Sequence, residues 1–222
     1  QAVFICMSAA LAFALSRVEP AMLKRFAYPA LLGGLVLLVL VLIPGIGQIR
    51  GGARRWISLG LFAFEPSELM KPLFVLYLAR SLSGKQEKMH DFFFGVLPHL
   101  VMMCVPILLL MLEPDFGASA VITVVTLAML FTAGASLFHL GLLGAAVVPP
   151  AVLLVWHSPY RLERVTAFLD PWRDPLGNGF QLVQSFLAFG SGGVLGTGLG
   201  NGKQKLFYLP EGHTDFIFAL IG

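Results

Sequence analysis

The sequence is poor in charged residues. Lysine, arginine, aspartate and glutamate together make up only 12% of its 222 residues, and the formal net charge is +3. The basic residues are scattered over predicted loops, so nothing in the chain favours a nucleic acid as a partner. Anionic lipid and a phosphorylated lipid substrate both stay open as partners.

Cysteine is also scarce, and so are the usual signals of a metal or nucleotide site. Cys6 and Cys104 lie far apart in apolar runs, with no CxxC pair, and we expect both to be small core hydrophobes. Residues 190–202 contain seven glycines, but Gln204 follows Lys203 where a P-loop has serine or threonine. We interpret this segment as a flexible or tightly turning loop. No internal repeat is evident, which argues against a transporter built from repeated halves.

Apolar residues are abundant. They make up 57% of the chain, the mean hydropathy is +0.84, and near-continuous apolar runs occupy 30–46 and 101–112. Such runs favour membrane helices over barrel strands, which alternate apolar and polar residues. The sequence therefore predicts an all-α fold, a polytopic integral membrane helical bundle that forms a single transmembrane domain over 1–222.

Six membrane spans and the start of a seventh near Asp215 are predicted. The six are Ala2–Leu15, Tyr28–Ile46, Ser67–Leu82, Phe94–Leu112, Ala118–Ala133 and Leu137–Trp156. The first is too short to cross a hydrocarbon core of about 30 Å. The chain starts at Gln1 and stops just inside a new apolar run, so we expect both ends to be cut. No signal peptide is visible.

Basic residues in the loops predict the topology. The first and third loops should be cytoplasmic because they carry six basic residues: Arg17, Lys24, Arg25, Arg80, Lys85 and Lys88. The second loop carries three: Arg50, Arg54 and Arg55. Residues 113–115 and the large loop 157–214 should then be extracytoplasmic. Within that loop, Arg161 and Arg164 lie three residues apart, with Val165 and Phe168 on the adjoining face, and this amphipathic pattern predicts an interfacial helix. A second helix is predicted over 180–189.

The start of the third span is a candidate site. Pro66 suits a first helical turn, Ser67 is a potential N-cap, and Glu68 and Lys71 lie three residues apart on one face. Two interpretations stay open. The pair could be a structural ion pair that holds two helices together, or Lys71 could face a cavity that takes an anionic headgroup.

Two neighbouring segments on the same predicted side also leave alternatives open. Asp115 could cap the helix that starts at Phe116, or it could orient a substrate or hold a divalent ion together with Glu113. Arg55, beside Trp56, could anchor the chain at the interface or clamp a phosphate.

The residues just before the seventh span are the strongest candidates for chemistry. Glu211, His213, Thr214 and Asp215 crowd one short turn next to an apolar run. Asp215 could be a helix N-cap. A partly desolvated carboxylate there could equally have a pKa raised toward the range of a general base.

These motifs together resemble those of the shape, elongation, division and sporulation (SEDS) family. The segments that carry the resemblance are residues 52–57, 66–71, 113–117, 170–177, 184–185 and 209–219. Residues 160–168 and 200–206 look more like the family's division members than its elongation members. Glu65 departs from the family, where glutamine is common.

The resemblance implies a ten-span glycosyltransferase of the bacterial inner membrane that polymerises lipid II into peptidoglycan strands. It implies a class B penicillin-binding protein and other division proteins as partners. By match to family motifs, Asp215 would be the catalytic base. Lys71, Arg55, Glu68, Asp115, Glu211 and His213 would bind substrate. Whether a divalent cation such as Mg²⁺ or Mn²⁺ serves as a cofactor stays open. A lipid II flippase and a non-catalytic scaffold are the rival functions.

Overall fold

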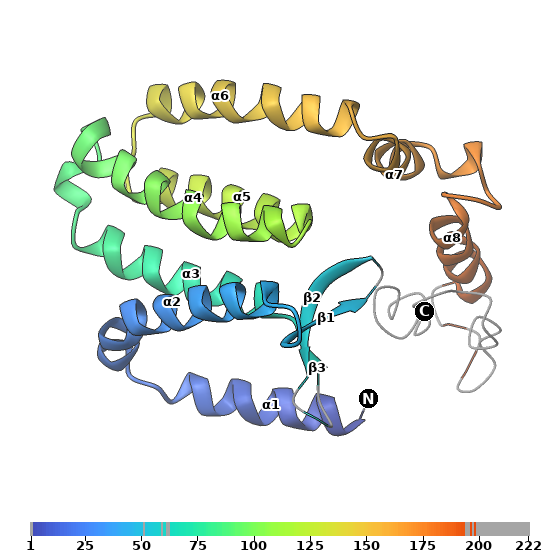
Figure 1. Cartoon of the computed structure of the whole chain (residues 1–222), viewed down its shortest axis with the longest axis horizontal. Helices are drawn as coiled ribbons and strands as arrows, with labels where there is room; N and C mark the ends of the chain where they lie inside the picture. Colours follow the sequence, from blue (N-terminus) through green and yellow to red (C-terminus); the bar gives the residue numbers. More distant parts are fainter. Residues whose placement is uncertain are drawn as a thin grey trace. The chain divides into compact units, whose positions relative to one another are not determined.

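The computed structural model describes residues 2–50, 52–58, 60, 63–193, 196 and 198 (Figure 1). Most of these residues are helical. The α-helices are α1 (Ala2–Ser16), α2 (Pro20–Leu42), α3 (Pro66–Ser83), α4 (Leu97–Leu112), α5 (Phe116–Thr132), α6 (Leu137–Trp156), α7 (Pro159–Leu169) and α8 (Phe180–Gly192). Three short helical segments join them: η1 (Gln86–Lys88), η2 (Phe92–Val96) and η3 (Pro171–Arg173).

Each of the six predicted spans corresponds to one of the helices α1 to α6. The largest difference is at α2, which begins at Pro20 rather than Tyr28, because proline at the first helical position starts the helix directly after Glu19. Lys24 and Arg25 therefore lie in this helix and not in a loop. Within the described residues, three stretches are long and apolar enough to cross a membrane: Pro20–Leu42, Phe92–Leu112 and Leu137–Trp156.

A small sheet between α2 and α3 was not predicted. Strands β1 (Gly47–Arg50), β2 (Ala53–Ser58) and β3 (Ala63–Phe64) pair antiparallel in the order β1-β2-β3. Gly52, in the turn between β1 and β2, has a φ of +83°, which glycine adopts without a steric penalty. The sheet brings Arg54 and Arg55 to the end of the helices where α3 begins.

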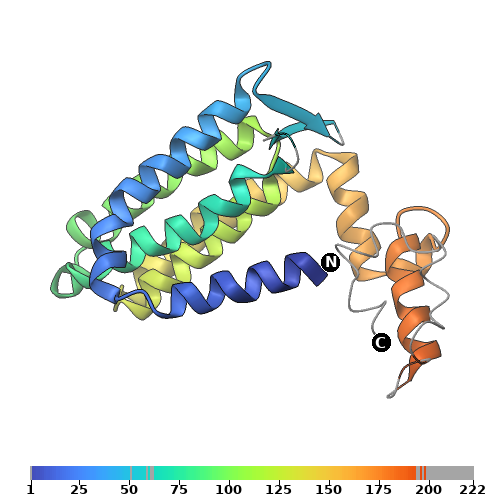
Figure 2. The same ribbon diagram turned by 90° about the horizontal axis from the view of Figure 1, so that it is seen from below.

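The core of the unit Gln1–Leu143 lies among α2, α3, α4 and α5, which run side by side in both views (Figures 1 and 2). At Gly34 the surface of α2 approaches α3 closely. A Cβ added at this position would lie 2.8 Å from the Met70 sulfur and 3.1 Å from a Leu73 methyl. Large buried side chains fill the rest of this core, among them Leu38, Phe74, Leu78, Leu110 and Leu130.

The outward faces of these helices are apolar, as expected where the neighbouring medium is lipid rather than water. Leu32, Val101 and Leu108 are exposed, although they lie within candidate spans. Cys6 and Cys104 are exposed free thiols on the same kind of surface. The prediction that they are core residues is therefore wrong, because an apolar run in a membrane helix supplies both a core face and a lipid face.

The unit Gly144–Gly222 contains the predicted helices of the large loop. Helix α7 covers Arg161, Arg164, Val165 and Phe168, and α8 covers the segment predicted over 180–189. In the turn between these two helices, the Asp174 carboxylate accepts hydrogen bonds from the backbone N–H groups of Gly177 and Asn178. Both segments are helical as predicted, and the interfacial position of α7 stays a prediction.

Candidate active site

The first turn of α3 starts one residue earlier than predicted. Pro66 occupies the first helical position and Glu65 the N-cap, without a side-chain capping bond. Ser67 is consequently inside the helix, fully buried, and its hydroxyl has no hydrogen-bond partner within the described residues. The prediction that Ser67 caps this helix is wrong, because the fixed φ of proline begins the helix before it.

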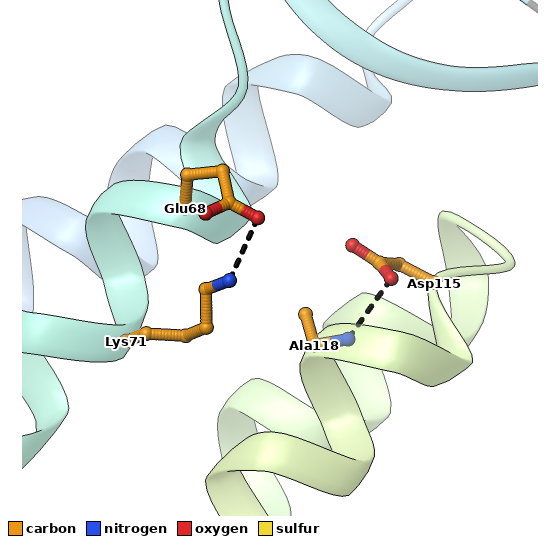
Figure 3. Close-up of polar contacts among 4 residues, drawn as sticks. All are labelled: Glu68, Lys71, Asp115 and Ala118. Atoms are coloured by element: carbon orange, nitrogen blue, oxygen red, sulfur yellow. Dashed lines mark hydrogen bonds and ion pairs between the residues drawn. The ribbon is translucent and has the colours of Figure 1, made fainter. Parts of the chain in front are cut away.

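Glu68 and Lys71 form the ion pair that the sequence predicted. The Lys71 ammonium donates to Glu68 Oε1 at 2.7 Å, within one face of α3 (Figure 3). The Lys71 side chain is 26% exposed and that of Glu68 is 64% exposed. Since the two partners belong to one helix, the pair does not hold two helices together, and the interpretation that it does is wrong. The structure leaves both charges open to a ligand.

Asp115 is the N-cap of α5. Its carboxylate accepts a hydrogen bond from the backbone N–H of Ala118 at 3.1 Å, and the residue is only 8% exposed. The predicted capping role is confirmed. In Figure 3 the same carboxylate points toward the Glu68–Lys71 pair, across the start of α3 and α5. A cap that uses one oxygen leaves the other free to act in a site.

Arg55 reaches this turn from strand β2. Its Nε donates to the backbone carbonyl of Glu113 at 3.1 Å, and its Nη2 donates to the carbonyl of Pro114. Its neighbour Arg54 donates from Nη1 to the carbonyl of Leu42, at the end of α2, at 3.0 Å. Both arginines therefore connect the sheet to helix ends, which the sequence pattern did not reveal.

Glu113 is a functional candidate that sequence reasoning did not develop. It ends α4, it is 0% exposed, and neither carboxylate oxygen has a hydrogen-bond partner within the described residues. Burial, with the charges of Asp115 and Glu65, raises the pKa of Glu113 to about 8, against a smaller opposing effect of Arg55. The sequence analysis named Glu113 only as a companion of Asp115 in holding a divalent ion, and nothing in the sequence showed that it is buried.

Glu65 belongs to the same group of charges. Burial first, and then the neighbouring carboxylates Asp115 and Glu68, raise its pKa above the usual range, while Arg55 lowers it. Segments far apart in the sequence thus bring four acids, one lysine and one arginine to one end of the helices. We call these six residues the polar cluster: Arg55, Glu65, Glu68, Lys71, Glu113 and Asp115.

The polar cluster does not form a metal site by itself. The described residues contain no group of three or more histidine, cysteine or acidic side chains placed to hold an ion. Mg²⁺ commonly takes one or two carboxylates and completes its shell with water and phosphate oxygens. Glu68 and Asp115 fit that limited role.

Three candidates cannot be placed relative to this cluster. Glu211, His213 and Asp215, together with the start of the seventh span, lie outside the described residues. Their roles stay predictions.

Comparison with known proteins identifies the relationship. The sequence model of the FtsW/RodA/SpoVE family, described as cell cycle proteins, matches residues 1–222. The chain belongs to this family. The resemblance predicted from the motifs is therefore confirmed, and with it a multi-pass protein of the bacterial inner membrane.

Named relatives in the family share close to half of the aligned residues. The chain is 48% identical over 206 residues to a probable peptidoglycan glycosyltransferase FtsW of Geobacter sulfurreducens, covering 93% of this chain and 55% of that protein. It is 47% identical over 185 residues to the stage V sporulation protein E of Bacillus subtilis, covering 83% and 50%. The chain thus spans about half the length of these relatives.

Solved structures show the same fold. One, described as a peptidoglycan synthase complex that coordinates polymerisation and crosslinking, matches with a TM-score of 0.72 at 35% identity, over 99% of this chain and 60% of that one. The rod shape determining protein RodA of Thermus thermophilus matches with a TM-score of 0.57 at 31% identity, over 67% and 48%.

Proposed function

We propose that this protein is an inverting glycosyltransferase that polymerises lipid II into β-1,4 glycan strands at the outer face of the inner membrane, in cell division. One observation carries the proposal. Arg55, Glu68, Lys71 and Asp115 come from three family motifs and lie together at one end of the helices. The relative named as a probable peptidoglycan glycosyltransferase FtsW supports the reaction, and the description of the family as cell cycle proteins supports the biological role.

The proposed reaction is a single displacement. The 4-hydroxyl of the acceptor's terminal sugar attacks the anomeric carbon of the donor, the bond to undecaprenyl pyrophosphate breaks, and the α-linked donor becomes β-linked. Asp215 takes the proton from the attacking hydroxyl as the general base. Glu211 and His213, in the same turn, would bind the substrate beside it.

The departing pyrophosphate needs positive charge. Lys71 is the residue best suited to supply it, because its ammonium has a single acidic partner within the described residues and is partly exposed. Glu68 holds that ammonium in place, and Asp115 faces the pair. A divalent cation bound by Glu68 or Asp115 would add Lewis-acid stabilisation of the same leaving group.

A flippase is the rival that shares this chain's many helices. Moving a charged headgroup across the bilayer calls for polar side chains spread between the two faces. Between Lys71 and Arg80, and throughout α4 and α5, the sequence has no aspartate, glutamate, lysine or arginine. The polar cluster therefore favours chemistry at one face over transport. A scaffold function would not explain why these charged side chains are grouped in the polar cluster.

The partner in this proposal is a class B penicillin-binding protein that crosslinks the strands, together with other membrane proteins of the division apparatus. The structural neighbour, described as a complex that couples polymerisation with crosslinking, supports such a partner.

The test is glycan synthesis from labelled lipid II by the full-length protein, purified with its transpeptidase partner. We expect polymer from the wild type and a loss of about 100-fold or more for Asp215→Asn, the usual contribution of a general base. Asp91→Asn is a matched control, since Asp91 caps a distant turn and asparagine caps equally well.

Each result has a definite meaning. Equal polymer from the wild type and Asp215→Asn would move the base to another residue. No polymer from either protein, with lipid II transport into vesicles still present, would favour the flippase. If neither activity is found and the partner still binds, the scaffold function stands.

A further inference from the structure

Arg55 is the side chain that joins the sheet to the turn carrying Asp115. Its Nε–H and Nη2–H groups donate to two successive backbone carbonyls, those of Glu113 and Pro114, which lie 58 and 59 residues further along the chain. A guanidinium holds its N–H donors in a rigid planar fork, so two parallel bonds of this kind fix the orientation of the turn as well as its position.

The turn needs such support because α4 has ended there. The last carbonyls of a helix have no partner within it and must find donors elsewhere. Arg55 supplies two donors to the carbonyls just beyond Leu112. The backbone N–H of Asp115 closes the turn from the other side by donating to the Leu110 carbonyl at 2.8 Å.

The same turn sets the direction of Asp115. Asp115 follows Pro114 directly and is also bonded to the first turn of α5. Its carboxylate accepts from the Ala118 N–H, and its backbone carbonyl accepts from the Ser119 hydroxyl at 2.8 Å. A shift of the 113–114 backbone would therefore move the Asp115 carboxylate relative to the Glu68–Lys71 pair that it faces (Figure 3).

We propose that Arg55 is a positioning residue, whose two hydrogen bonds to the Glu113 and Pro114 carbonyls hold Asp115 in its catalytic orientation toward Glu68 and Lys71. This role differs from a clamp on the substrate's pyrophosphate, because two of the guanidinium's five donors are spent on the protein's own backbone. The effect on catalysis rests on the proposed function. The effect on the turn does not.

Arg54 provides a matched control on the same strand. It donates to a helix-end carbonyl as Arg55 does, but through one nitrogen, Nη1, to the single carbonyl of Leu42. A lysine ammonium can form one charge-assisted hydrogen bond, but its single nitrogen cannot reproduce the two fixed donors by which a guanidinium bonds two carbonyls. The Lys variants of the two neighbours therefore separate loss of the fork from loss of an arginine in general.

The first experiment measures amide hydrogen exchange in the full-length protein bound to its transpeptidase. For Arg55→Lys we expect exchange in the peptide 113–119 to be faster by about tenfold, since the turn opens locally more often. Arg54→Lys should leave that peptide at the wild-type rate. Unchanged exchange in Arg55→Lys, or loss of the fold and of the complex, would overturn the inference, which requires a folded protein with a loosened turn.

The second experiment measures polymerisation of lipid II by the same proteins. A positioning role predicts that Arg55→Lys lowers kcat by about 10- to 100-fold, the scale expected for a small misplacement, with KM nearly unchanged. A pyrophosphate clamp predicts the reverse, a raised KM that the lysine charge partly preserves. That pattern, or wild-type kcat with a loosened turn, would contradict the positioning role.

The two readouts keep this inference separate from the proposed function. If the wild type makes no polymer, the glycosyltransferase proposal fails. The exchange comparison between Arg55→Lys and Arg54→Lys then decides by itself whether Arg55 holds the turn.

Discussion

Helix α3 has polar contacts at both ends, and the two ends differ in how completely their partners are satisfied. Near its C-terminal end, Ser81 lies 2.9 Å from Nε2 of the buried His99, whose Nδ1 lies 2.6 Å from the carbonyl of Gly95. A carbonyl can only accept, so Nδ1 carries a proton, and in the neutral ring Nε2 then accepts from the serine hydroxyl. Both ring nitrogens of His99 therefore have partners within the protein.

The N-terminal end of α3 shows the opposite state. Glu113 is as buried as His99, yet its carboxylate oxygens and the Ser67 hydroxyl have no partners within the described residues. Lys71 and Glu68 are partly open. Buried polar groups are costly unless they are paired. Buried side chains whose hydrogen bonds are all made within the protein, such as His99 and Ser81, therefore indicate a structural role. Charged side chains that lack such partners indicate a binding or catalytic site.

Removal of the Lys71 charge should have the largest effect in this comparison. We expect Lys71→Met to lower polymerisation of lipid II by about 100- to 1,000-fold, the scale for loss of one group that stabilises a developing anion. Thermal stability of the complex should change little, because a partly exposed ion pair contributes less than about 1 kcal/mol. Lys88→Met, at an exposed position in η1, is the control. Similar losses in both variants would contradict a special role of Lys71.

Removal of His99 should instead cost stability. We expect His99→Leu to lower the free energy of unfolding by about 1 to 3 kcal/mol, since the Ser81 hydroxyl and the Gly95 carbonyl both lose a buried partner. Activity per folded molecule should persist. Adding Ser81→Ala should then cost little more, and a thermal melt of the single and double variants measures this coupling. A folded but inactive His99→Leu protein would break the distinction between the two ends.

The pH dependence of stability should reveal the buried acid Glu113. The pKa of Glu113 is raised from 4.5 to about 8 on folding, so the folded state binds the extra proton between those values. Its stabilising contribution is present below pH 4.5 and is lost as the pH rises toward 8, by at most about 1.4 kcal/mol per pH unit.

Glu113→Gln tests that sign directly, because glutamine resembles the protonated acid and does not titrate. Melting temperatures measured from pH 5 to pH 9 should fall more steeply for the wild type than for the variant. Glu65→Gln should flatten the curve as well, since the pKa of Glu65 is raised for the same first cause, burial. Parallel curves for the wild type and Glu113→Gln would show that Glu113 is ionised in the folded protein.

Much of the helical framework could be predicted because apolar runs are long and continuous in a membrane protein. The positions of α3, α5 and α6 followed from those runs. The cap was one of the two roles left open for Asp115, and the structure shows it, because an acid directly before an apolar helix can accept from its first backbone N–H groups. The small sheet was missed, since β1, β2 and β3 are short and pair through backbone bonds that carry no strong sequence period.

The candidate site was predictable as a set of residue types and not as an arrangement. The charged residues Glu68 and Lys71 were visible at helical spacing, so their pairing followed from the sequence alone. Arg55 could be identified as a candidate, but its bonds to the backbone at 113 and 114 could not, because a carbonyl acceptor leaves no mark in a side-chain pattern.

By itself, the sequence determined the membrane class, the number and order of the helices in the described part, and the family, because hydropathy and local spacing act within a few turns of chain. Only the tertiary structure decided which charges meet. It placed Arg55 against residues 58 positions away and buried Glu113 among other acids. Burial and electrostatic environment depend on all neighbours in space, so the raised pKa of Glu113 appears only once the helices have packed.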